Sequence, residues 1–174
     1  MSPIGLLLVL LALAGFGPIV APDATASLPR ASPELTAVAE AFVRFANGEA
    51  ESPPVDTPVE LFVAGRSAKT LSGEDVLDRA RWRICGDLDG YAARTCPFSA
   101  LDLVAGAANG VVVTSAAPTH PCMHAPPPPA RLSVYRAVSV TGRGSPTCVD
   151  YFAVQLFVND VGQVVAVNLV MSEP

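Results

Sequence analysis

The sequence predicts an α+β domain in which N-terminal helices pack on a curved antiparallel sheet of about four main strands. The first observation is the stretch 149–171, where two runs of alternating apolar residues flank the turn sequence NDVG at 159–162. Such alternation is typical of a β-hairpin with a buried face. The second observation is a helical repeat of apolar residues between Ser32 and Asn47. The third is composition, because 174 residues that are 51% hydrophobic and 16% charged suit one domain.

The loop length sets the register of this hairpin. A four-residue loop places Val158 opposite Gln163, and Leu156 then faces Val165. A slip by one residue would mix apolar and less apolar faces. The opposite faces are also partly apolar, so we expect the hairpin to lie in the middle of the sheet. The predicted core face consists of Phe152, Val154, Leu156 and Val158 on the first strand and Val165, Val167, Leu169 and Met171 on the second.

The remaining elements are predicted from local signals. Ser32 is a good helix N-cap, and Asn47-Gly48 suits a helix end. Ser72 and Ser99 each precede an aspartate by three residues, a pattern typical of a helix start. In chain order, the sequence predicts a helix over 33–46, a strand over 59–63, a weak strand over 68–71, helices over 73–81 and 99–108, a strand over 111–116, and a strand over 132–141 before the hairpin.

The N-terminal segment has the pattern of a secretory signal peptide. Residues 4–20 are nearly all aliphatic or glycine, and Ala24-Thr25-Ala26 forms an A-x-A cleavage site. The alternative is an uncleaved anchor, which the short apolar run and its glycines disfavour. We therefore expect residues 1–26 to be removed and residues 27–174 to form a single secreted or extracytoplasmic domain.

Charge excludes one class of function. The net charge is −5, and the chain is mildly acidic, so a nucleic-acid-binding role is disfavoured. No later stretch is long and apolar enough to span a membrane, so we expect no membrane association after signal cleavage.

Four cysteines in an exported chain predict two disulfides. Of the three connectivities, we favour Cys85–Cys96, which closes a short polar loop, and Cys122–Cys148. The second pair follows from strand order, because the chain from Cys122 must return to the sheet end where Cys148 opens the hairpin.

The element order resembles the cone-shaped fold of NTF2-like proteins, such as ketosteroid isomerase and small polyketide cyclases, over roughly residues 33–171. Three segments also resemble uncharacterised exported actinobacterial proteins: residues 97–101, His120-Pro121-Cys122, and the strand after Cys148. The second resemblance implies an exported location and disulfides, and no particular chemistry.

The strongest metal-like cluster is residues 120–124, which include His120, Cys122, Met123 and His124. Histidine, cysteine and methionine together suit copper or zinc. An oxidised cysteine is not a thiolate ligand, however, so the disulfide interpretation is favoured and we expect neither metal nor cofactor.

The candidate catalytic residues are Asp150 and Tyr151, at the start of the hairpin. A carboxylate on an apolar face has a raised pKa and suits a general base. The competing interpretation is an exposed aspartate beside a disulfide.

The sequence therefore favours a small exported binding domain of the cell envelope, whose extracellular ligand or partner is not specified. Two alternatives stay open. One is an NTF2-like enzyme of the isomerase, cyclase or dehydratase type. The other is a secreted protease inhibitor that presents the proline run 126–129.

Overall fold

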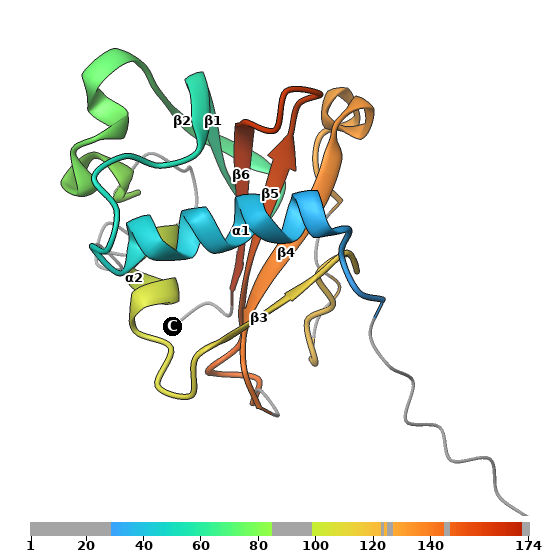
Figure 1. Cartoon of the computed structure of the whole chain (residues 1–174). Helices are drawn as coiled ribbons and strands as arrows, with labels where there is room; N and C mark the ends of the chain where they lie inside the picture. The colour runs from blue at the N-terminus through green and yellow to red at the C-terminus, as the bar shows by residue number, and fades with distance from the viewer. Residues whose placement is uncertain (1–28, 85–98, 123, 125–126, 145–146, 172–174) are drawn as a thin grey trace, which may run out of the picture.

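The computed structural model describes residues 29–84, 99–122, 124, 127–144 and 147–171. These residues form one mixed sheet of six strands in the order β2-β1-β6-β5-β4-β3, with helix α1 laid across one face (Figure 1). The strands are β1 (Val55–Val63), β2 (Arg66–Leu71), β3 (Val111–Thr114), β4 (Arg136–Gly142), β5 (Phe152–Val158) and β6 (Val164–Met171). The helical elements are α1 (Pro33–Ala46), α2 (Ala100–Ala105) and the 3₁₀ turns η1 (Gly73–Val76), η2 (Arg79–Trp82) and η4 (Ala130–Val134).

The α+β class is confirmed, whereas the expected antiparallel sheet of about four main strands is wrong. Strand β1 pairs with β6 in parallel, with Val63 opposite Leu169. The other neighbour of β1 is β2, which forms the edge of the sheet. The burial of the C-terminal half of β1 explains why β1 is an interior strand. Leu61, Phe62 and Val63 are all buried, so this end of β1 is covered on both faces, as in an interior strand.

Helix α1 forms as the sequence predicts. The side chain of Ser32 accepts a hydrogen bond from the backbone N–H of Leu35 at 3.4 Å, and Gly48 beyond the helix end has a φ of 77°. The buried stripe of the helix packs on the sheet and contains Leu35, Ala39, Phe42, Phe45 and Ala46.

The predicted helix over 73–81 is wrong, because this segment forms the separate 3₁₀ turns η1 and η2. Ser72 makes no side-chain capping bond, and Asp78 instead accepts from the N–H of Ala80 and starts a second turn. The turns bring Trp82 into the core, where its indole N–H donates to the carbonyl of Val76 at 2.9 Å. The third predicted helix begins at its Ser99 cap but ends at Ala105, earlier than expected.

The hairpin has its expected core face but not its expected register. Phe152 lies opposite Met171, two residues from the predicted partner, and a bulge between Phe157 and Val158 leaves Val165 outside the ladder. The cause is the turn, in which Asn159 accepts from Val161 and Gln163 through its side chain. The even shift preserves the core face over most of the hairpin, and Val164 takes the buried place expected of Val165.

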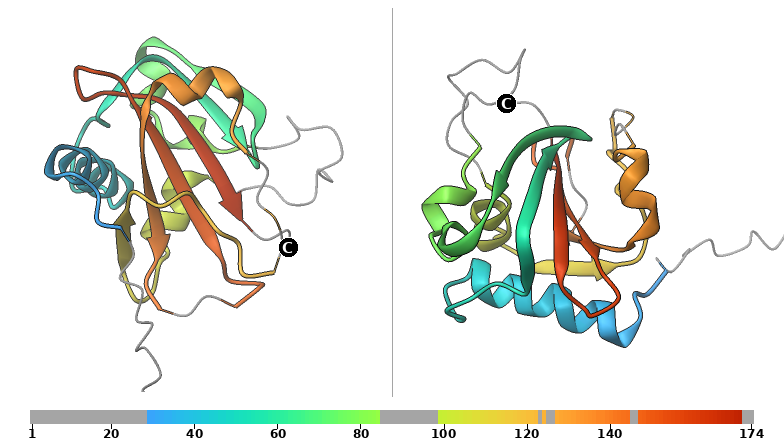
Figure 2. Two further views of the ribbon diagram at one scale, coloured as in Figure 1. Left: turned by 90° about the vertical axis from the view of Figure 1, so that its right-hand side faces the viewer. Right: turned by 90° about the horizontal axis from the view of Figure 1, so that it is seen from above.

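Strand β4 also starts later than predicted. Leu132 lies in η4 and packs on the face of the sheet opposite α1, beside Phe62 and Phe157. Arg136 opens the strand as an exposed residue and donates to Glu34 of α1 at 2.8 Å. Residues 130–134 therefore cover part of the second face and do not extend the sheet (Figure 2).

A row of buried polar side chains crosses this second face. Each residue lies opposite the next on four adjacent strands, and all four are buried: Thr114, Ser139, Gln155 and Asn168. Asn168 donates to Gln155 and accepts from the N–H of Gly65. Ser139 donates to the carbonyl of Ala116 at 2.9 Å, which holds the segment after β3 against the sheet.

Within the described part of the chain, no helix has the length and apolarity needed to cross a membrane.

Candidate ligand pocket

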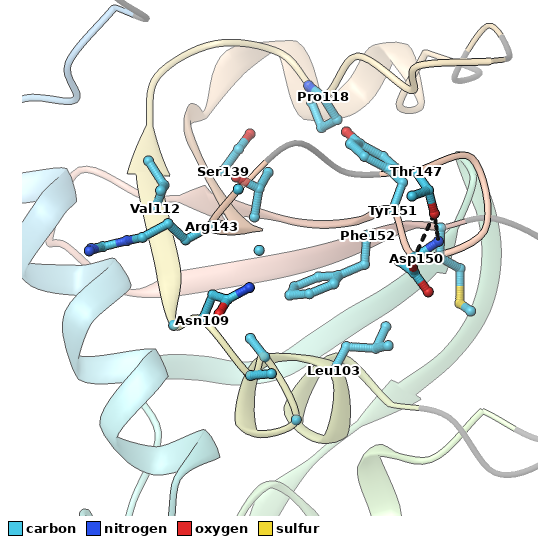
Figure 3. A pocket seen from close by; sticks show the side chains of 18 of the residues that line it. Leu103, Asn109, Val112, Pro118, Ser139, Arg143, Thr147, Asp150, Tyr151 and Phe152 are labelled. Atoms are coloured by element: carbon cyan, nitrogen blue, oxygen red, sulfur yellow. Dashed lines mark hydrogen bonds between the residues drawn. The ribbon is translucent and has the colours of Figure 1, made fainter.

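A pocket of about 840 Å³ lies at one end of the sheet, where β3 and β5 begin and β4 ends (Figure 3). Three segments surround it: the end of α2 with the loop after it, residues 116–119, and the residues between β4 and β5. Strand pairing therefore fixes the side of the pocket that is formed by the sheet. Two other sides of the pocket are formed by loops.

The centre of the pocket is apolar. The ring of Phe152 projects into it, with Leu103 below and Asn109 reaching toward the ring from the start of β3 (Figure 3). Gly142 supports this ring position, because a Cβ at Gly142 would lie 3.2 Å from a ring carbon of Phe152. The hydroxyl groups of Ser139 and Thr141 also belong to the lining.

The two carboxylates of the lining, Asp102 and Asp150, contact other protein groups. Asp102 forms an ion pair with Arg83 at 3.4 Å, and Asp150 accepts from the hydroxyl of Thr147 at 2.8 Å. The side chain of Arg143 extends away from Phe152 (Figure 3). The interior of the pocket therefore suits an uncharged, largely apolar molecule with a few hydrogen-bonding groups.

Tyr151 anchors the wall formed by residues 116–119. The ring of His120 packs edge-on against Tyr151, with ring centroids 4.7 Å apart, and His120 is only 5% exposed. Its Nδ1 accepts from the backbone N–H of Cys122 at 3.1 Å. Burial raises the pKa of the Tyr151 phenol above its usual value of 10.0, and a hydrogen bond with the backbone of Thr119 opposes that rise.

The Cys122–Cys148 disulfide, with Cα atoms 5.7 Å apart, joins the chain that follows residues 116–119 to the turn before β5. It is the pairing predicted from the sequence, and its structural reason is the strand order, since β4 lies between β3 and β5. The predicted partner pair, Cys85 and Cys96, falls outside the described residues.

The two candidate catalytic residues both line the pocket, and Asp150 is exposed, as in the competing interpretation of the sequence. Asp150 was predicted on the apolar face of a strand; it lies in the turn before β5 and is exposed. Tyr151 is buried beside His120. The structure therefore shows no desolvated carboxylate at this position.

The candidate metal ligands separate from one another. His120 is buried against Tyr151, whereas His124 is exposed. Cys122 is in the disulfide, and no cluster of three or more potential metal-binding side chains occurs among the described residues.

Sequence reasoning missed the pocket itself. Phe152 was assigned to the core face, where it does lie, and its second role arises because Gly142 leaves room beside it at the sheet end. The alternation of Ser139 and Thr141 with the valines of β4 marks the second face of the sheet, whereas Phe152 lies on the core face, so this pattern did not indicate the space beside Phe152.

In comparisons of sequence and structure, the chain matches no family, no curated protein and no solved structure.

The buried phenol predicts a late titration. Of the three tyrosines in the chain, Tyr151 is expected to ionise at higher pH than a solvent-exposed tyrosine because burial raises its pKa. A raised pKa in the folded state stabilises the fold below about pH 10, and this contribution is lost as pH rises further. Phenolate absorbance of the folded protein, compared with the Tyr151→Phe variant, measures this. If the parent protein and Tyr151→Phe have the same titration curve above the usual tyrosine pKa, the late-ionising phenol is not Tyr151.

Proposed function

We propose that this chain is an exported, disulfide-stabilised binding domain whose pocket holds a small, uncharged and largely apolar ligand. The observation that carries the proposal is the pocket lining, in which the Phe152 ring lies centrally while Asp102 and Asp150 contact other protein groups at the margin. A disulfide between exposed cysteines supports an oxidising, extracytoplasmic location in the cell envelope or outside it.

The topology supports a further part of the proposal, an NTF2-like cone. A helix crosses one face of a sheet in which the first strand pairs in parallel with the last, and the sheet is curved (Figure 2). This arrangement agrees with the order of helices and strands on which the resemblance to NTF2-like proteins is based.

Filling the pocket is expected to weaken ligand binding. The neutral apolar dye Nile red serves as the probe, measured by its fluorescence. Thr141→Phe places a ring in the lining of the pocket, and we expect at least a tenfold loss of affinity, or about 1.4 kcal/mol. The matched control is Thr70→Phe on the exposed edge strand β2, which leaves binding unchanged. Equal binding by both variants would refute the pocket as the ligand site.

An enzyme remains the second candidate because Asp150 and Tyr151 both line the pocket. Under the binding proposal, Asp150→Asn is expected to leave Nile red affinity within about twofold, since this exposed carboxylate contacts Thr147 at the margin. Isothermal titration of the variant checks this. A catalytic activity of the parent chain that disappears in Asp150→Asn, with the fold intact, would favour the enzyme.

A further inference from the structure

The pocket lies beside β3, the last strand of the sheet, which pairs with β4 along one side (Figure 1). The backbone N–H of Arg143 donates to the carbonyl of Gly110 at 2.9 Å, so the backbone of Gly110 faces β4. Along an antiparallel strand this direction alternates from residue to residue. The N–H and C=O groups of Val112 and Thr114 therefore also face β4.

The backbone groups of Val111 and Val113 consequently point away from the sheet. Further along the same edge, the N–H of Ser115 donates to the carbonyl of Pro29 at 3.2 Å, which agrees with this alternation. Within the described part of the chain, neither valine makes a backbone hydrogen bond outside the β3–β4 ladder. The outer edge of β3 thus offers an N–H and a C=O at each valine, and the segment before α1 already bonds to this edge at Pro29.

The two edges of the sheet differ in charge. The edge strand β2 carries Arg66 and Lys69, and charged side chains on an edge disfavour the addition of another strand. The sequence of β3 is Val-Val-Val-Thr, without a charge, and its valines are half-buried. Valine also favours strand pairing because it is β-branched. The edge at β3 is therefore the one suited to accept a further strand.

The pocket is continuous with this edge, because Val112 and Thr114 belong to its lining. Val112 lies opposite Thr141, another lining residue, so both are on the same face of the sheet. In an added antiparallel strand, the residues opposite Val111 and Val113 exchange hydrogen bonds with β3. The residue between them lies opposite Val112, on the same face and with its Cβ about 4.5–5.5 Å away. Its side chain is therefore placed at the pocket.

We propose that the outer edge of β3 binds an extended peptide segment of a partner protein in antiparallel orientation, and that one apolar side chain of this segment fills the pocket beside Val112. Main-chain hydrogen bonds hold the segment, and the pocket selects the side chain. The residues on both sides of this anchor need a free N–H, which excludes proline there. A charged anchor is disfavoured because the pocket centre around Phe152 is apolar. Filling of the pocket rests on the proposed binding function, whereas strand pairing does not.

The probe is the fluorescein-labelled, amidated peptide Lys-Thr-Thr-Leu-Thr-Thr-Lys, in which leucine is the anchor, and binding is measured by fluorescence anisotropy. N-methyl groups on the two threonines beside leucine remove the donors to Val111 and Val113, and we expect about a tenfold loss of affinity from these two hydrogen bonds. The matched control carries its N-methyl group on leucine, whose N–H points away from β3, and is expected to bind like the parent peptide. Equal binding of all three peptides overturns strand pairing.

A serine in place of the leucine tests the anchor. We expect about a tenfold loss of affinity, since the apolar contact in the pocket disappears while the main-chain bonds remain. Equal binding of the serine and leucine peptides overturns the pocket as the site of the anchor side chain.

The variant Val113→Pro tests the same edge from the protein side. Proline removes the outward N–H and is compatible with an edge strand at such a position, and Val113 is not part of the pocket lining. We expect about a tenfold loss of peptide affinity, with Nile red affinity kept within about twofold. Val113→Ala keeps the N–H and is the matched control. Equal peptide binding by the two variants overturns the proposal. If Val113→Pro does not fold, the N-methylated peptides decide the question on the parent chain.

Nile red separates this proposal from the binding function on which it partly rests. A parent protein that binds Nile red but not the leucine peptide overturns the edge site and leaves the binding function standing. A parent protein that binds the peptide, with the expected loss on threonine N-methylation but without binding Nile red, supports strand pairing and refutes the binding function. Sedimentation of the parent protein as a dimer that Val113→Pro dissociates would show that a second copy occupies the edge, and would overturn the peptide proposal.

Discussion

Replacing Trp82 with alanine is expected to destabilise the domain by about 3–5 kcal/mol, the usual range for deleting a buried large aromatic side chain. The indole is 1% exposed and lies between η1 and α1. Its ring meets Phe42 edge-on at a centroid distance of 5.7 Å and Phe45 at 6.2 Å. The substitution also leaves the carbonyl of Val76 without its indole donor.

Urea unfolding followed by circular dichroism measures this loss, because the variant has no tryptophan fluorescence. Leu77→Ala is the matched control: it lies in the same segment but is 49% exposed, so a change within about 0.5 kcal/mol is expected. A Trp82→Ala midpoint as high as that of Leu77→Ala would mean that the 3₁₀ turns do not belong to the core.

Trp82 also shows how far the sequence predicts this fold. It directly follows residues 73–81, for which the sequence predicts a helix. The segment instead turns twice because the Asp78 side chain bonds the N–H of Ala80, a local choice that apolar periodicity does not encode. Arg79 then donates to the carbonyls of Phe45 and Ala46 at the end of α1, a tertiary contact with no local signal.

The hairpin and the pocket each have one feature that the sequence predicts and one that it does not. The alternation of Val154 and Leu156 correctly predicts which face is buried, since side chains alternate whatever the register. The register itself depended on the side chain of Asn159 and was wrong by two residues. The space beside Phe152 depends on Gly142 and was not predicted, whereas the pairing of Cys122 with Cys148 near the pocket was.

Removal of the Cys122–Cys148 bond is expected to have the second large effect on stability. The cysteines are separated by 26 positions, and in the chain-entropy account a loop of this length contributes about 3.5 kcal/mol by restricting the unfolded chain. The loop encloses η4 and the whole of β4, so unfolding without the bond releases a central strand of the sheet.

The comparison that tests this is between Cys122→Ser/Cys148→Ser and Cys85→Ser/Cys96→Ser, both unfolded in urea without reductant. If Cys85 and Cys96 are bonded as the sequence predicts, their shorter loop gives a smaller loss, about 3 kcal/mol, so the first pair is expected to have the lower midpoint. A lower midpoint for the Cys85→Ser/Cys96→Ser protein would show that the stabilising cross-link is the other one.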